Sequence, residues 1–176
     1  MKYFWVIFAI GSVLLLWFSW TVSLRARRYH GIARFFAFES ILLLFLLNVR
    51  FWFHEPFSVV HILAWLCLIL SLFLAVHGVY LLIKLGRPDG QLENTTRLVV
   101  RGAYKFIRHP LYASIAFLGL GIFLKRVTVL TSVLAGVVLV SVYLTAKIEE
   151  REMLAKFGNE YAAYRTGTKM FLPFVL

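Results

Sequence analysis

The sequence predicts an all-α integral membrane protein with five transmembrane helices. Hydrophobic residues make up 61% of the 176 residues, and the mean hydropathy is +0.83, which lies outside the range of ordinary soluble domains. Two stretches, residues 3–24 and 127–146, contain no charged residue. Each is long enough for the roughly 20 residues that a spanning helix needs.

The distribution of charge predicts the orientation in the membrane. A formal charge of +11 would suit a nucleic-acid-binding protein, but the cations lie in the loops between apolar segments, so no nucleic-acid partner is expected. Only Arg50, Lys125 and Arg126 fall on one side. By the positive-inside rule the chain is expected to have its N-terminus outside and its C-terminus in the cytoplasm. The cations on the expected cytoplasmic side include Arg25, Arg27, Arg28, Arg34, Lys84, Arg87, Arg97, Arg101, Lys105, Arg108, Arg151, Lys156, Arg165 and Lys169.

The five spans are expected at residues 3–24, 35–53, 57–83, 110–124 and 127–148. A signal peptide is the competing interpretation of the first span, because Lys2 precedes an apolar run, but that run is long for a signal sequence and an Arg-rich segment follows it. The fourth span has an apolar part of only 14 residues. It covers roughly 21 Å of a ~30 Å bilayer core, so it must be extended, locally broken or placed in a thinned region.

The chain is expected to form one domain over residues 1–176, with its catalytic region in the loop 86–109 and the tail 149–176. Cys67 is the single cysteine, so no disulfide within the chain and no cysteine-based metal site is expected. Four loop cations recur at helical spacing and would share a face if the loop were helical, either on anionic headgroups or against a ligand. A glycine within the loop argues against a helix and leaves a positively charged loop as the alternative. The four cations are Arg97, Arg101, Lys105 and Arg108, and the glycine is Gly102.

A polar cluster precedes the fourth span, in the segment Arg108-His109-Pro110-Leu111-Tyr112. Proline suits the first turn of a helix, because its missing N–H and fixed φ cost nothing there. His109 then lies at the helix cap, where free backbone N–H groups and the helix dipole favour an anion such as a carboxylate. Tyr112 is three residues further on and shares the same helical face. The alternative interpretation of both residues is a cap and an interfacial aromatic anchor.

Two adjacent carboxylates, Glu149 and Glu150, follow the fifth span. Neighbouring side chains on a helix diverge by ~100°, so at most one is expected to face a ligand while the other pairs with a cation or is solvated. If the last two spans form an antiparallel hairpin, His109 and Glu149 lie ~10 Å apart along the axis, near enough to hold two ends of one elongated ligand. Three glycines in these spans would allow close helix packing or leave room for a ligand. They are Gly119, Gly121 and Gly136.

These motifs together resemble the isoprenylcysteine carboxyl methyltransferase family and its phospholipid methyltransferase relatives. The resemblance covers about residues 86–176, whereas the first eighty residues match only as apolar helices. It rests on Arg-His-Pro-Leu-Tyr, on Arg101-Gly102-Ala103-Tyr104, on Glu149-Glu150, and on the tail from Phe157-Gly158-Asn159-Glu160-Tyr161 through Tyr164-Arg165 to Leu172-Pro173.

The resemblance implies a membrane methyltransferase that binds S-adenosylmethionine at the cytoplasmic ends of the last spans. Its acceptor would be a lipophilic molecule or lipid taken from the bilayer, with isoprenylcysteine carboxyl O-methylation or a related lipid methylation as the reaction. It implies a multi-pass protein of a bacterial or archaeal cell membrane, or of an internal membrane. The implied cofactor-binding residues are His109, Tyr112, Tyr104 and one or both of Glu149 and Glu150.

The chemistry of the acceptor decides what further residues are needed. A carboxylate acceptor is already ionised and requires a cation to position it, whereas an amine must lose a proton. Arg101, Arg108 and Arg165 are the candidate positioning residues for an anionic acceptor. Two other functions remain open: an NADPH-dependent membrane sterol-type reductase with a related C-terminal pattern, and a small non-catalytic membrane protein.

Overall fold

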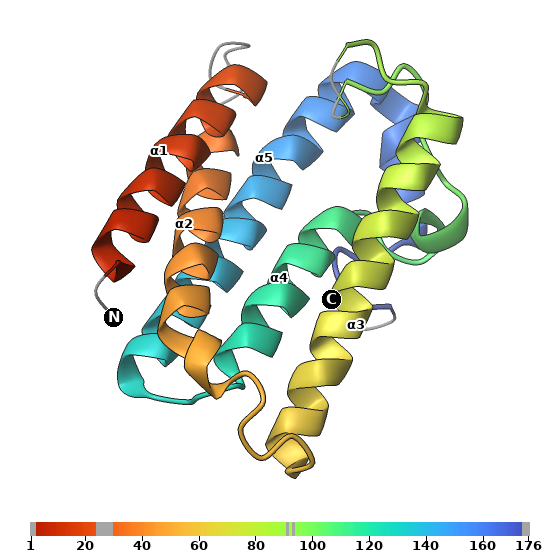
Figure 1. Ribbon diagram of the computed structural model, residues 1–176. Helices are drawn as coiled ribbons and strands as arrows, with labels where there is room; N and C mark the ends of the chain where they lie inside the picture. Colours follow the sequence, from red (N-terminus) through yellow and green to blue (C-terminus); the bar gives the residue numbers. More distant parts are fainter. Residues whose placement is uncertain (1–2, 24–29, 91, 93, 174–176) are drawn as a thin grey trace.

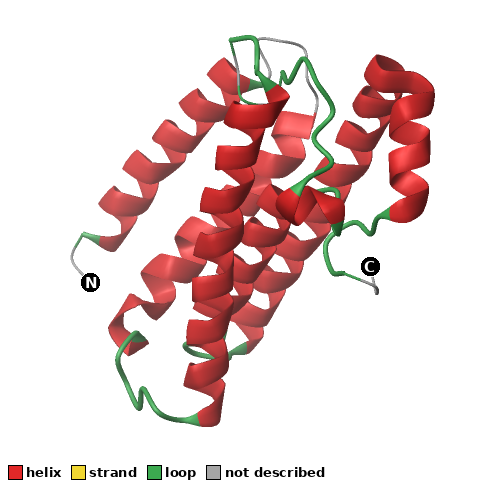
Figure 2. Cartoon of the chain, turned by 90° about the vertical axis from the view of Figure 1, so that its right-hand side faces the viewer, coloured by secondary structure: helices red, strands yellow, loops and turns green. Residues whose placement is uncertain are grey.

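The computed structural model describes residues 3–23, 30–90, 92 and 94–173. Within these residues the chain consists of helices and connecting loops without a β-strand, which confirms the predicted all-α class (Figures 1 and 2). Four described helices are long and apolar enough to cross a membrane, and one further apolar helix is shorter.

The five main helices fall close to the predicted spans. Their first and last residues are Phe4–Val22 for α1, His30–Asn48 for α2, Val59–Leu81 for α3, Pro110–Phe123 for α4 and Val129–Gly167 for α5. The structure differs most at the last helix, which has 39 residues. At ~1.5 Å per residue it is about 58 Å long and exceeds a ~30 Å bilayer core, so its charged part beyond residue 146 extends past the uncharged membrane-spanning stretch.

The helices form one bundle in which α2 and α4 both pack against α5, α3 packs against α4, and α1 packs against α2 (Figure 1). Small residues allow the close contacts. A Cβ at Gly78 of α3 would come within 2.8 Å of Leu111 in α4, and one at Gly119 within 2.9 Å of Val138 in α5. Gly136, by contrast, has open space around it.

The short helix α4 determines where space remains in the bundle. It has 14 residues, begins at Pro110 as predicted, and starts well below the ends of α3 and α5 that flank it (Figure 1). The chain before it does not continue as a helix. The region above the N-terminal end of α4 is therefore enclosed by the longer helices and by the loop that precedes α4.

That loop is not the helix that charge spacing allowed. Only a single 3₁₀ turn, η4, forms within it, at Gly102–Lys105. Gly102 has φ 60°, and a Cβ there would lie 2.7 Å from His77 Nε2 and from Leu81 Cδ1 of α3. Glycine is needed both for this backbone conformation and for the close approach to α3. The four loop cations consequently share no helical face, and the loop alternative is confirmed.

The tail returns to the start of α4 because α5 breaks at Gly158. This residue has φ 54° and ψ −128°, a conformation that essentially only glycine adopts. The last part of α5 folds back beside the preceding part (Figure 2). Residues 168–170 then pair with residues 106–109: the N–H groups of Arg108 and His109 donate to the carbonyls of Lys169 and Met170 at 2.8 and 3.1 Å.

The opposite end of the bundle is fixed by a buried lysine in the turn between α4 and α5. Lys125 is 3% exposed. Its Nζ lies 3.6 Å from the centroid of the Trp65 ring, a cation–π contact, and its carbonyl oxygen is 3.0 Å from His61 Nε2. Asn48 of α2 also donates to the carbonyl of Ile122 at 2.8 Å. These contacts join the turn to α2 and α3.

Candidate functional site

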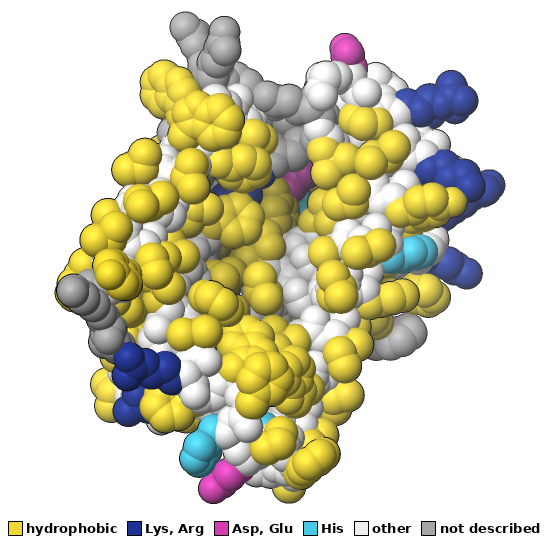
Figure 3. Space-filling model, viewed as in Figure 1, with side chains coloured by type: hydrophobic (Ala, Val, Ile, Leu, Met, Phe, Trp, Pro, Cys, Tyr) yellow, Lys and Arg dark blue, Asp and Glu magenta, His cyan; other side chains and the backbone are white. Residues whose placement is uncertain are grey.

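A cavity of about 490 Å³ lies above the N-terminal end of α4. The space-filling view shows a hollow on this face of the bundle, with hydrophobic side chains on its walls and charged atoms inside (Figure 3). Its volume falls within the range of roughly 300–1,000 Å³ typical of small-molecule sites. The lining residues are Phe18, Val22, Arg34, Phe38, Leu82, Leu92, Thr95, Leu98, Val99, Tyr104, Arg108, His109, Leu111, Tyr112, Ile115, Glu149, Met153, Tyr161 and Tyr164.

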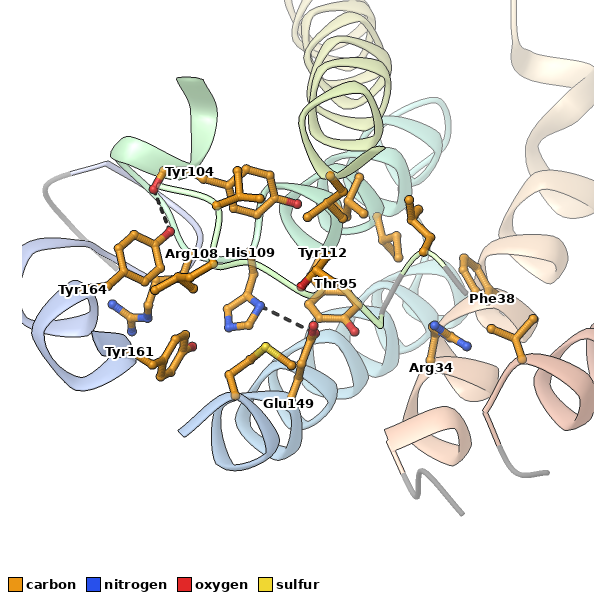
Figure 4. Close-up of a pocket in the computed structure, with 18 of the residues that line it drawn as sticks. Arg34, Phe38, Thr95, Tyr104, Arg108, His109, Tyr112, Glu149, Tyr161 and Tyr164 are labelled. Atoms are coloured by element: carbon orange, nitrogen blue, oxygen red, sulfur yellow. Dashed lines mark hydrogen bonds and ion pairs between the residues drawn. The ribbon is translucent and has the colours of Figure 1, made fainter. Parts of the chain in front are cut away.

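His109 stands at the centre of the polar part of this lining (Figure 4). It is the N-cap residue of α4, as predicted, although its side chain makes no capping hydrogen bond. Its ring is 6% exposed and lies between two carboxylates. Nδ1 is 3.8 Å from Glu149 Oε2, and Nε2 is 3.8 Å from Glu150 Oε1. Nε2 is buried without a hydrogen-bond partner among the described residues.

Arg108 holds the loop against α5. Its Nε donates to Glu150 Oε1 at 2.7 Å, and its Nη1 donates to the carbonyl oxygens of Thr168 and, at 3.3 Å, of Arg165. Burial alone raises the pKa of Glu150, but the proximity of His109 and the hydrogen bond and charge of Arg108 outweigh it and lower that pKa to about 2. Arg108 and Glu150 therefore form an ion pair throughout the physiological pH range.

The two glutamates have different surroundings. Glu149 lines the cavity and its side chain is 20% exposed, whereas Glu150 lies behind it, 4% exposed, and pairs with Arg108. This agrees with the expectation that at most one of the two faces a ligand. The expected ~10 Å axial separation between His109 and Glu149 does not keep the two side chains apart. They meet at His109 because the chain before α4 leaves the helix and pairs with the tail.

Four tyrosines complete the wall around the polar groups. Tyr112 is 7% exposed, and its ring centroid lies 5.5 Å from that of His109. Tyr164 donates its hydroxyl to the carbonyl oxygen of Tyr104 at 2.6 Å. Burial raises the pKa of Tyr104, Tyr161 and Tyr164, and the charge of Glu149 adds to the effect at Tyr104. These phenols stay protonated at neutral pH, and the buried Tyr161 hydroxyl has no partner among the described residues.

The structure brings most of the predicted site residues together, but not all. Tyr104, Arg108, His109, Tyr112 and Glu149 line the cavity, and Glu150 supports it from behind. Arg101 and Arg165 are exposed and do not line it, although Arg165 Nε lies 3.8 Å from Glu150 Oε2.

Sequence reasoning missed the contribution of the first two helices and of part of the loop. Arg34 was counted among the loop cations, and the apolar side chains beside it gave no signal that distinguished them from other lipid-facing residues. The lining residues that the sequence did not single out include Phe18, Val22, Arg34, Phe38, Thr95 and Met153.

The fold and the cavity define a class of protein: a helical membrane protein with a polar, partly enclosed site at one end of its apolar helices. Residues 59–160 match the phospholipid methyltransferase family, and the chain belongs to this family. The matched residues include α3, the loop, α4 and most of α5, so the family match contains His109, Tyr112 and both glutamates but not Arg34.

A curated relative supports the same activity. The chain is 32% identical over 73 residues to methanethiol S-methyltransferase 1 of Bradyrhizobium diazoefficiens. The alignment covers 40% of this chain and 24% of that protein, so the chain spans about a quarter of the relative's length. Together, the family match and this relative support a membrane methyltransferase.

Proposed function

We propose that the protein is an S-adenosylmethionine-dependent methyltransferase that acts on a lipophilic acceptor taken from the bilayer, with its site on the cytoplasmic side. The observation that carries this proposal is the single cavity that joins the polar residues at the start of α4 to the apolar side chains of α1 and α2. A polar cofactor and an apolar acceptor require adjoining environments of this kind.

The cavity residues suit the chemical groups of S-adenosylmethionine. Glu149 offers a carboxylate that accepts hydrogen bonds from ribose hydroxyls or from the amino group. The N-terminal end of α4, at Leu111 and Tyr112, offers backbone N–H groups to the methionyl carboxylate. Two buried polar atoms without a described partner, His109 Nε2 and the Tyr161 hydroxyl, are further groups that a polar ligand would satisfy.

The chemistry assigns the chain a positioning role. When bound, S-adenosylmethionine supplies a methyl group on a sulfonium; the acceptor forms a bond to that methyl as the carbon–sulfur bond breaks and its electron pair passes to sulfur. The walls exclude water and hold the reacting atoms in line. The tyrosine rings favour a cationic sulfonium through their π faces, and Tyr104 and Tyr112 lie beside Glu149 at this end of the cavity (Figure 4).

Binding measurements on the full chain in lipid nanodiscs test the cofactor. We expect saturable calorimetric binding of S-adenosylmethionine and none of NADPH. His109→Ala should weaken this binding at least about tenfold, the loss of ~1.4 kcal/mol. The matched control is His54→Ala, an exposed histidine at the other end of the bundle. Binding of NADPH alone would favour the reductase, and binding of neither ligand would favour the non-catalytic function.

Transfer of a radiolabelled methyl group identifies the acceptor. Prenylcysteine carboxylates and phospholipid amines are the acceptors that the sequence resemblance suggests, and the name of the Bradyrhizobium relative adds a small thiol such as methanethiol. All three are assayed beside a whole lipid extract. Label in one class of product, lost in His109→Ala and kept in His54→Ala, identifies the acceptor; no label in any fraction contradicts the methyltransferase proposal.

A further inference from the structure

A buried arginine lies in the wall of the cavity that the first two helices form. Arg34 of α2 is 6% exposed and lines the cavity. Its Nη2 donates to Ser23 Oγ at 2.6 Å, and its Cζ lies 5.6 Å from the Phe18 ring centroid. Figure 4 places Arg34 and Phe38 on the opposite side of the cavity from Arg108 and Tyr164. A cation in an apolar helix bundle is costly, and such residues mark functional sites.

The other candidate cations are not placed to bind an acceptor from the apolar side. Arg108 is engaged by Glu150 and by the carbonyl oxygens of Thr168 and Arg165. Arg101 and Arg165 do not line the cavity. Among the described lining residues, Arg34 is the arginine that α1 and α2 present beside apolar side chains.

Charge complementarity indicates what Arg34 would bind. S-adenosylmethionine carries a net charge of +1, from an ammonium, a sulfonium and a carboxylate, and it would complement Glu149 on the other side of the cavity. The charge of Arg34 would be complemented by an anionic group entering along α1 and α2. Guanidinium groups bind carboxylates and phosphates through paired hydrogen bonds.

Resting on the proposed function, we propose that Arg34 binds the anionic group, a carboxylate or a phosphate, of an amphiphilic acceptor. The apolar chain of the acceptor lies against Phe18, Val22 and Phe38, which line the cavity beside Arg34. Arg34 is thus a specificity-determining residue contributed by the part of the chain that lies outside the family match.

Two other roles for Arg34 make different predictions. If Arg34 only holds α1 to α2 through Ser23, its replacement lowers stability without changing selectivity between ligands. If it holds the methionyl carboxylate, its replacement weakens S-adenosylmethionine binding.

The test measures charge selectivity in the full chain in phosphatidylcholine nanodiscs. The probes are dodecyl phosphate, dodecanoate and neutral dodecanol, and saturable binding is scored above their partition into empty nanodiscs, with and without S-adenosylmethionine. The wild type should bind at least one anionic probe tenfold or more tightly than dodecanol. The anionic probe that binds more tightly indicates whether the acceptor group is a phosphate or a carboxylate.

Variants assign this selectivity to Arg34. Arg34→Gln should remove the preference, Arg34→Lys should keep part of it, and Ser23→Ala should leave it within twofold. The Kd of S-adenosylmethionine should stay within twofold in all three. The proposal is overturned if the wild type shows no charge preference, if Arg34→Gln keeps it, or if cofactor binding falls in parallel.

The wild-type preference alone decides if Arg34→Gln does not fold, with Arg34→Lys as the remaining variant. The cofactor titration is scored separately, so absence of S-adenosylmethionine binding contradicts the methyltransferase while the charge preference still tests Arg34.

Discussion

Arg108 and Glu150 form a buried ion pair, in which Nε donates to Oε1 at 2.7 Å. The arginine lies in the loop before α4 and the glutamate lies on α5, so the pair joins the two segments that carry His109 and Glu149. Because Arg108 also donates to carbonyl oxygens of the tail, the loop, the tail and α5 meet at one guanidinium.

Replacing Glu150 by Gln is expected to destabilise the protein. The change leaves Arg108 buried without its counter-charge, and breaking a buried ion pair in this way costs about 3–5 kcal/mol. Denaturant unfolding in detergent measures the loss. The control is Arg165→Gln, because Arg165 is 47% exposed and lies 3.8 Å from Glu150, where a pair contributes about 0–1 kcal/mol. Equal stability of the two variants would contradict the assignment of Arg108 as the partner.

Replacing Glu149 by Gln is expected to affect binding more than stability. Glu149 faces the cavity, so the change removes a charged acceptor for the cofactor, worth about 1.5–3 kcal/mol in a hydrogen bond. Calorimetry should show S-adenosylmethionine binding weakened at least about tenfold. Unfolding should change less than in Glu150→Gln. The reverse order of the two variants in both measurements would exchange the roles of the two glutamates.

Acid is expected to loosen the loop through Glu150. Its pKa is about 2 in the folded protein, below the ordinary value of 4.5. The unfolded state therefore binds the proton first, so this contribution to stability is complete above pH 4.5 and is lost as the pH falls from about 4.5 toward 2. Unfolding curves measured between pH 6 and pH 2.5 should show this loss. In Glu150→Gln the same interval should show a shallower decline; an unchanged slope would contradict the assignment.

Gly158→Ala is expected to disturb the tail. No atom lies within 4 Å of a Cβ at Gly158, so the cost comes from the backbone conformation alone, about 1–3 kcal/mol. The strain should displace Tyr161 and Tyr164 from the cavity and weaken cofactor binding. Gly136→Ala is the matched control, because its Cβ also meets open space but lies within a regular helix, where alanine is favoured by up to ~1 kcal/mol. Similar unfolding of both variants would show that the break at Gly158 is not required.

Trp65→Leu is expected to lower stability without changing the site. It removes the ring that faces Lys125 at 3.6 Å, and a desolvated cation–π contact contributes about 2 kcal/mol. Thermal unfolding should show the loss, while the Kd of S-adenosylmethionine should remain that of the wild type. A large change in that Kd would indicate that the two ends of the bundle are coupled.

The sequence predicted the helices and the start of α4 because their signals are local. Uncharged runs indicate spans, and Pro110 marks the first turn of α4. The path of the loop depends on contacts between distant residues, such as Ile107 with Lys169, which leave no periodic pattern. The break at Gly158 depends on a positive φ that a glycine permits but does not announce.

Arg34 shows the same limit for the site. In the sequence it follows a group of loop arginines, and its spacing to His109 carries no information. Only the packing of α2 against α4 and α5 brings it to the cavity. The predicted cofactor-binding residues remain a prediction, with five of the six positively placed by their position at the cavity or directly behind Glu149: Tyr104, His109, Tyr112, Glu149 and Glu150.

The cavity wall is divided between two parts of the chain. The polar lining around His109 comes from the segment that matches the family, and the apolar wall with Arg34 comes from α1 and α2, which precede it. Such a division separates the machinery that related enzymes share from the part that can diverge. Exchanging the first 58 residues among relatives would then redirect the enzyme to a new acceptor while it kept the same methyl donor.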